Sequence, residues 1–186
     1  MLLGLCGEKG DGKTTVASHL ARMYYQVELH SFASTLKTFC IHLGAPTDSI
    51  CGTQTQKEQI IPGFGISGRA LMKNVGQSMK KTYGQSFYVD QVMREVDLYP
   101  QLVHIVTDVR FAAEALAVRS RGGLLVRIRN PGRDTSFDID DDETERLSAI
   151  ACPKEVSGRT VAELKKCVDE LVLPLGLVPY TFRGEF

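Results

Sequence analysis

Residues 7–14, Gly-Glu-Lys-Gly-Asp-Gly-Lys-Thr, match the phosphate-binding pattern G-x-x-x-x-G-K-[ST] at every fixed position. Residues 2–6 before this stretch form an apolar run of strand length, and Val16, Leu20 and Tyr24 after it fall on one helical face. A strand, a glycine-rich loop and a helix are the context that the motif requires. The alternative is a glycine-rich turn that binds nothing, and the agreement between spacing and context disfavours it.

The residue types of this loop suit the binding of a nucleoside triphosphate. Its glycines allow backbone N–H groups to turn inward around an anion, and the start of the following helix adds its positive end. We expect Lys13 to reach the β- and γ-phosphates and the Thr14 hydroxyl to bind Mg²⁺.

The composition indicates a folded protein of one domain, residues 1–186. The chain is 43% hydrophobic, and its 22 basic residues balance 22 acidic residues, so no overall charge attracts nucleic acid or a membrane. The five cysteines form no C-x-x-C pair, which favours reduced thiols in the cytoplasm. We expect no signal peptide and no membrane span, because no stretch approaches about 20 apolar residues.

Strand-like and helical segments alternate along the chain, which predicts an α/β protein with a parallel sheet. We expect further strands at 27–32, 102–106 and 124–129, and further helices at 36–43, 69–79, 87–96, 112–119 and 160–171. Two segments lack apolar periodicity. We interpret residues 45–68 as a long irregular loop or mobile insert on the acceptor side, and residues 130–145, which are rich in acidic side chains, as a lid loop.

Several charged residues stand beside predicted strand and helix ends. Asp108 follows the strand at 102–106, and carboxylates at the ends of parallel strands face the ligand crevice, so Asp108 is a candidate for Mg²⁺ or substrate. Glu114 either fixes a turn by pairing with Arg110 or reaches the substrate. Arg69 begins a helix, where its guanidinium can fork onto a phosphate. Lys37 is either a solvated lysine or a ligand contact.

The order of these motifs resembles the phage deoxynucleoside monophosphate kinases of the P-loop kinase superfamily. The resemblance covers most of the chain and rests on residues 7–14, 32–37, 69–72 with 75–76, 108–110 with Glu114, and 122–123 leading to 129–132. It implies the three-layer α/β/α sandwich of the P-loop nucleoside triphosphate hydrolase/kinase fold. It also implies ATP-dependent phosphoryl transfer to a deoxynucleoside monophosphate, homodimers, and the host cytoplasm if a phage encodes the protein.

The resemblance also implies roles for individual residues. ATP would be bound by Gly7, Lys9, Gly10, Asp11, Gly12, Lys13, Thr14, Thr15 and Arg129, with Mg²⁺ on Thr14 and Asp108. Arg110, or a lid arginine such as Arg129 or Arg133, would meet the charge that develops during transfer. The acceptor nucleotide would be bound by Lys37, Arg69, Tyr88, Asp108, Arg110 and Glu114. Lys13, Arg69, Asp108 and Arg110 would be catalytic.

The sequence departs from the family pattern in three places. Asp11 puts a carboxylate where family members have a small or basic residue, and it either lowers ATP affinity or contacts the acceptor. The His-x-Ser/Thr-Glu element is reduced to residues 142–145, which lack the histidine, so only Glu145 is carried over. The Asn-x-Gly element is reduced to Ser157 and Gly158.

Two other classes of function stay open. One is a switch or motor that hydrolyses ATP or GTP. A GTPase would carry Asp-x-x-Gly and Asn-Lys-x-Asp elements, and the sequence contains neither; a helicase or packaging motor would normally be larger and more basic. A kinase of another small acceptor, such as dephospho-coenzyme A or a sugar, would share the donor site. Lys37, Arg69 and Arg110 are cations from separate segments, and together they suit a dianionic phosphate. Among phosphate acceptors, the resemblance favours a deoxynucleoside monophosphate.

Overall fold

The computed structural model describes residues 1–132 and 150–180, and its contacts divide the chain into two units. The larger unit comprises residues 1–31 and 93–186, and the smaller unit comprises residues 32–92. We describe each unit by itself. A single domain over residues 1–186 stays a prediction, and residues 133–145 of the predicted lid loop, with Arg133 and Glu145, lie outside the described residues.

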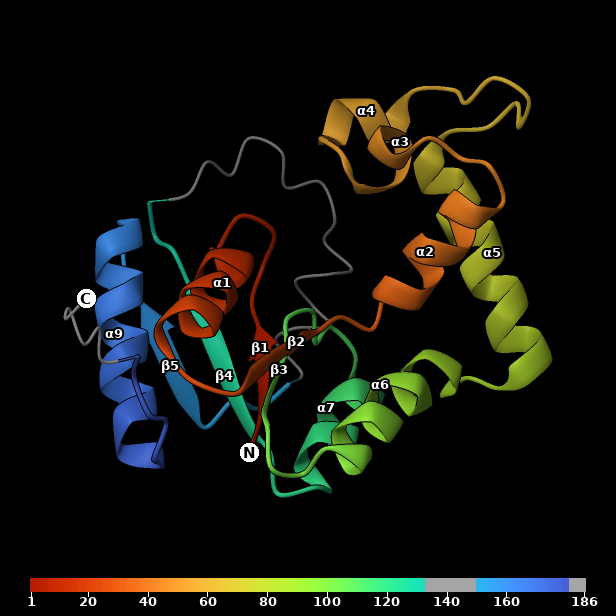
Figure 1. The fold of residues 1–186 in the computed structure, drawn as a ribbon. Coiled ribbons are helices and arrows are strands. Elements are labelled where there is room, and N and C mark those ends of the chain that lie inside the picture. Colours follow the sequence, from red (N-terminus) through yellow and green to blue (C-terminus); the bar gives the residue numbers. More distant parts are fainter. Residues whose placement is uncertain (133–149, 181–186) are drawn as a thin grey trace, which may run out of the picture. The chain divides into compact units, whose positions relative to one another are not determined.

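The larger unit is built on a five-stranded sheet with the strand order β2-β3-β1-β4-β5 (Figure 1). Every neighbouring pair of strands is parallel, as predicted. The carboxyl ends of all the strands therefore meet at one edge of the sheet. The strands are β1 (Leu2–Cys6), β2 (Val27–His30), β3 (Val103–Val106), β4 (Leu124–Arg129) and β5 (Lys154–Ser157).

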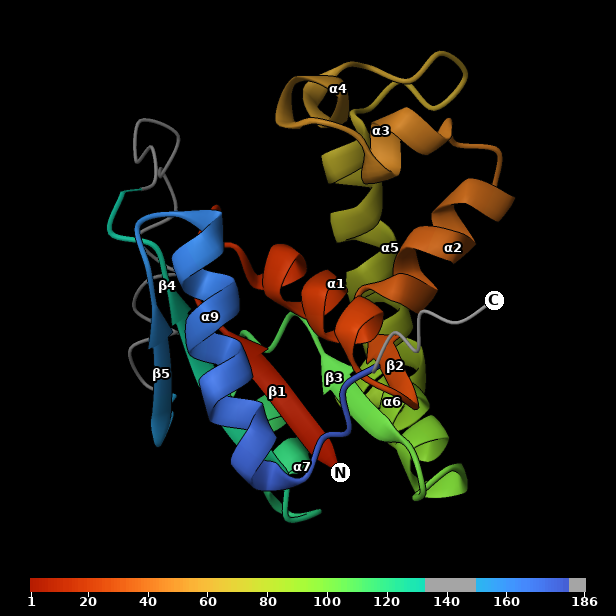
Figure 2. The ribbon, with the colours of Figure 1, turned by 60° about the vertical axis from the view of Figure 1, so that its left-hand side comes forward.

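Helices cover both faces of this sheet (Figure 2). Leu3 and Leu5 of β1 share a buried cluster with α1 (Lys13–Met23) and α9 (Val161–Val172) on one face. Gly4 points to the other face, where α7 (Ala112–Arg119) packs so closely that an added Cβ would lie 3.3 Å from Val118. Alternate residues of a strand point to opposite faces, so β1 is buried on both sides. The α/β class and the three-layer sandwich are confirmed.

The smaller unit is helical and surrounds a core of its own. Its helices are α2 (Ser34–His42), α3 (Thr47–Cys51), α4 (Gln54–Glu58) and α5 (Gly68–Tyr83), while α6 (Phe87–Leu98) crosses the boundary to the larger unit. Cys40, Ile50, Ile61 and Leu71 form the buried centre of this unit.

Within residues 45–68, the expectation of an irregular loop was wrong. This segment holds α3 and α4, each five residues long. A helix of five residues completes little more than one turn, so it shows no apolar periodicity that a sequence pattern can detect. Ile50 anchors α3 in the core, and Thr53 begins α4 with a capping box. Whether the segment moves stays a prediction.

One strand of the larger unit was not predicted. In β5 only Val156 is buried, and its neighbours in the strand are exposed. Such a short edge strand has too few alternating apolar residues to be recognised. No helix of the described residues combines the length and the apolar character that crossing a membrane requires.

Candidate active site

The phosphate-binding loop connects β1 to α1 at the carboxyl edge of the sheet. Three glycines of the loop have positive φ angles that residues with a Cβ rarely adopt: 147° at Gly7, 86° at Gly10 and 91° at Gly12. At Gly7 an added Cβ would also lie 2.5 Å from the carbonyl oxygen of Ile128. The loop therefore requires glycine both for its backbone conformation and for its close approach to β4.

Lys13 folds back across the loop that precedes it. Its Nζ donates hydrogen bonds to the carbonyl oxygens of Gly7, at 2.7 Å, and Glu8, at 2.6 Å. Lys9, Gly10 and the Thr14 side chain are exposed, so a ligand can reach this part of the loop. The ammonium group thus lies where the motif requires a cation for phosphate oxygens.

The Asp11 side chain holds the phosphate loop in place by accepting hydrogen bonds from backbone N–H groups. The carboxylate is only 5% exposed; its Oδ2 accepts a hydrogen bond from the Glu8 N–H at 2.7 Å, and its Oδ1 accepts one from the Asn130 N–H at 3.3 Å. A buried carboxylate needs such donors, because desolvation without them is costly. Asp11 consequently ties the phosphate loop to the residue that follows β4, a role that the sequence did not predict.

Asp108 follows β3, the neighbour of β1 in the sheet. The Ser31 hydroxyl, which follows β2, donates a hydrogen bond of 2.7 Å to Asp108 Oδ2 and so orients the carboxylate. The sequence reasoning missed Ser31, since an isolated serine between a strand and a helix carries no distinguishing signal. Thr14 and Asp108 offer one hydroxyl and one carboxylate, and Mg²⁺ in nucleotide sites is typically held by such a small set together with phosphates and waters. These residues therefore fit Mg²⁺.

Glu114 is buried and caps the start of α7. Its Oε2 accepts hydrogen bonds from the backbone N–H groups of Arg110, at 2.7 Å, and Phe111, at 3.0 Å. These contacts satisfy N–H groups at the start of a helix, which otherwise lack partners. The sequence left two roles for Glu114, fixing a turn or reaching the substrate. These hydrogen bonds favour the first role, and Glu114 makes them to backbone N–H groups rather than to the Arg110 side chain. Arg110 itself is exposed.

A hollow of about 440 Å³ lies beside the loop, at the ends of β4 and β5. It is lined by Gly7, Glu8, Asp11, residues 127–131 and Glu155. Arg129 is exposed, with its Nη1 3.9 Å from Glu155 Oε1, a distance at which an ion pair contributes little. Arg129 is thus available to a ligand at this edge of the sheet.

The predicted acceptor residues Lys37, Arg69 and Tyr88 belong to the smaller unit. Lys37 is half-buried and has no hydrogen bond or ion pair within the described part of the chain, whereas Arg69 Nε pairs with Glu58 Oε1 at the surface. The Tyr88 hydroxyl is buried and also has no hydrogen-bond partner among the described residues. Burial raises the pKa of Tyr88, and the Cys40 thiol adds to this effect. Their roles toward a substrate stay predictions.

Together, these features define the class of the protein. A parallel sheet of order β2-β3-β1-β4-β5 carries a G-x-x-x-x-G-K-T loop between its central strand and α1, with an oriented carboxylate after the adjacent strand. This is the arrangement of a P-loop kinase, a phosphotransferase.

Comparison with known proteins narrows this class. No protein-family model matches the sequence. The chain is 34% identical over 150 residues to "Putative deoxynucleotide monophosphate kinase" of Acanthamoeba polyphaga mimivirus, covering 71% of this chain and 75% of the relative. The chain therefore belongs to the deoxynucleotide monophosphate kinase family. Among solved structures it is similar to shikimate kinase from Aquifex aeolicus, at 19% identity and a TM-score of 0.45, over 94% of this chain and 96% of that one.

Proposed function

We propose that the protein transfers the γ-phosphoryl group of ATP to a deoxynucleoside monophosphate, giving ADP and the deoxynucleoside diphosphate. The observation that carries this proposal is the relative at 34% identity whose name specifies a deoxynucleotide monophosphate as the substrate. The phosphate loop supplies the donor site that such a reaction needs. The 2′-deoxy form of the acceptor is preferred over the ribonucleotide.

On the donor side, binding of ATP exchanges the hydrogen bonds of Lys13. Two of its present acceptors are the neutral carbonyl oxygens of Gly7 and Glu8. Phosphate oxygens are charged and therefore stronger acceptors, so the ammonium group moves to the β- and γ-phosphates. Mg²⁺ held by Thr14 and Asp108 would neutralise charge on the β- and γ-phosphate oxygens. The hydrogen bond from Ser31 supports this role, because it fixes the orientation of the Asp108 carboxylate.

On the acceptor side, Lys37, Arg69 and Arg110 supply the positive charge that a dianionic phosphate requires. The pair between Arg69 and Glu58 is exposed to water, with 52% of each side chain accessible, and so stabilises the protein little. Arg69 can therefore leave Glu58 for a phosphate at small cost. The chemistry itself consists of holding donor and acceptor in line and stabilising developing charge.

A panel of acceptors tests the proposal. The four common deoxynucleoside monophosphates, the matching ribonucleotides, dephospho-coenzyme A and gluconate are each incubated with MgATP, and the products are separated. We expect a diphosphate from one or more deoxynucleotides. If another acceptor is phosphorylated and no monophosphate is, the substrate assignment is wrong. If no acceptor is phosphorylated and ATP is still hydrolysed, the transfer reaction itself is refuted.

A further inference from the structure

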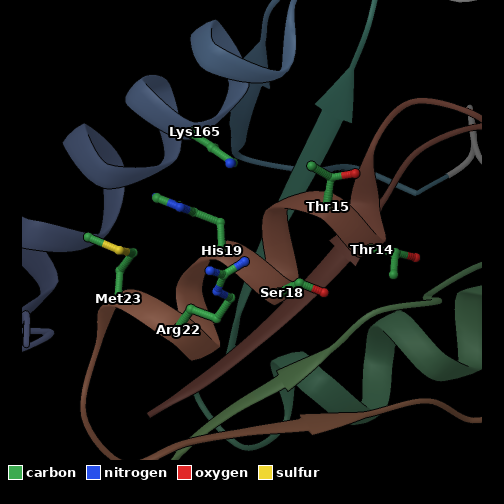
Figure 3. A pocket seen from close by; sticks show the side chains of 7 residues that line it. All are labelled: Thr14, Thr15, Ser18, His19, Arg22, Met23 and Lys165. Atoms are coloured by element: carbon green, nitrogen blue, oxygen red, sulfur yellow. The ribbon is translucent and has the colours of Figure 1, made fainter.

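A cleft of about 510 Å³ lies between α1 and α9 in the larger unit (Figure 3). Its volume is within the range of small-molecule sites in proteins. It is lined by Thr15, Ser18, His19, Arg22, Met23 and Lys165, and Thr14 of the phosphate loop also contributes to it. None of these residues except Thr14 and Thr15 takes part in the proposed reaction.

Two cations from different helices face this cleft without an acidic partner. Within residues 1–132 and 150–180, neither Arg22 nor Lys165 makes a hydrogen bond or an ion pair. Arg22 lies in the last turn of α1, where the helix dipole favours a cation. Lys165 gains no such benefit, because it lies in the first half of α9, and it is half-buried.

The acidic residue one helical turn after Lys165 in α9 binds other side chains. Asp169 lies one turn after Lys165, a spacing that allows an ion pair. However, its Oδ1 and Oδ2 are each 2.9 Å from His19 Nε2, and its Oδ1 accepts a hydrogen bond of 2.8 Å from the Tyr24 hydroxyl. Lys165 consequently keeps its charge directed at the cleft.

The other lining residues indicate what an anion in this cleft would carry. The hydroxyl groups of Thr15 and Ser18 have no hydrogen-bond partner in the described part of the chain, so they are available to oxygen atoms of a ligand. Met23 is 44% exposed and presents an apolar, polarisable surface. Cations with hydroxyls suit phosphate, and an adjoining apolar wall suits a flat ring.

We propose that the cleft between α1 and α9 binds a second phosphate-bearing molecule of nucleotide size, separate from the donor and the acceptor. The nucleoside end of the ATP donor is uncharged, so it leaves the charges of Arg22 and Lys165 available to a separate anion. This site goes beyond the proposed reaction. Because Thr14 and Thr15 belong both to the cleft and to the donor loop, the two ligands affect each other's affinity.

Binding to the protein that carries Lys13→Ala, which weakens the donor site, tests this proposal. Inorganic tripolyphosphate and, separately, dATP are titrated at fixed ionic strength, and the amide signals of His19, Arg22 and Lys165 are followed by two-dimensional NMR. We expect both ligands to shift these signals. Tighter binding of dATP than of tripolyphosphate supports a ligand of nucleotide size, whereas equal affinities for the two ligands would contradict that part of the proposal.

Two double variants of equal charge separate the cleft from the general surface. Arg22→Gln with Lys165→Gln removes both cations and should weaken binding roughly tenfold or more, because two charge-assisted contacts are lost. Lys154→Gln with Lys166→Gln removes the same charge outside the cleft and should not change the affinity. Lys165→Arg alone should retain binding. Equal affinities in the two double variants, or no shift of the cleft amides, would overturn the proposal.

Discussion

Replacing Asp11 by alanine should impair the binding of ATP much more than the binding of the acceptor. The change removes the acceptor of two backbone N–H groups, those of Glu8 at 2.7 Å and Asn130 at 3.3 Å. A hydrogen bond to a charged group contributes about 1.5–3 kcal/mol, and the longer of the two bonds is the weaker. We therefore expect a loss of about 2–4 kcal/mol from the loop conformation that binds phosphate.

Water that enters the altered loop recovers part of this loss. A remaining cost of about 1.4–2.8 kcal/mol corresponds to an increase of about 10- to 100-fold in the KM for ATP. Asp11→Asn should fall between the two proteins, because one amide oxygen still accepts from the Glu8 N–H while the NH₂ group cannot accept from Asn130.

Steady-state kinetics with ATP and acceptor varied separately, together with urea unfolding, measures these effects. Asp90→Asn is the matched control for Asp11→Asn, since it makes the same chemical change at an exposed carboxylate that accepts a hydrogen bond from Ser86. It should leave both KM values unchanged. An unchanged KM for ATP in Asp11→Ala would refute the reasoning. An equal rise of both KM values would also contradict it, because it would indicate general destabilisation.

Three further predictions test the site. Lys13→Ala should lower turnover by roughly 10²–10³ while the protein still folds and unfolds cooperatively in urea, and near-normal turnover would contradict the assignment. Arg69→Ala should raise the KM of the acceptor more than the KM of ATP. Arg69→Lys should restore acceptor binding poorly, because lysine lacks the bidentate fork of arginine; equal changes in the two KM values would show that Arg69 does not bind the acceptor. The hydrogen bond from Cys6 and the charge of Arg127 lower the pKa of Cys152 to about 7, whereas the pKa of Cys6 is raised by its hydrogen bond to Cys152 and by burial. Alkylation by iodoacetamide should therefore rise with pH around a midpoint near 7 at Cys152 and leave Cys6 unlabelled, as mass spectrometry of peptides can check, and a midpoint near 9 would show that Cys152 is not activated.

Features that depend on a local pattern were predictable from the sequence. The strand Leu124–Arg129 has the bounds that its apolar run and the flanking turn residues predict. The phosphate loop was recognisable because its glycines and Lys13 have fixed spacings. Thr160 accepts a hydrogen bond from the Glu163 N–H, as the spacing of a capping box predicts, although Glu163 reaches back to the Arg159 N–H.

Features that depend on distant contacts were not predictable. Asp11 and Asn130 are 119 residues apart, and Ser31 and Asp108 are 77 residues apart, so no local pattern connects them. The sequence shows a carboxylate in the loop and an isolated serine, but the hydrogen bonds that give them a role exist only once β1 and β4, or β2 and β3, lie side by side.

The central place of β1 has a consequence for synthesis on the ribosome. Its partners are β3, where Leu2 pairs with His104, and β4, where Leu3 pairs with Leu124. At a translation rate of about 5–20 residues per second, β1 waits roughly 5–20 s before its first partner has been made. Pairings so distant in sequence form slowly, and an apolar strand left exposed can associate with other chains. Chaperones that shield the nascent chain during this interval should therefore raise the yield of active protein.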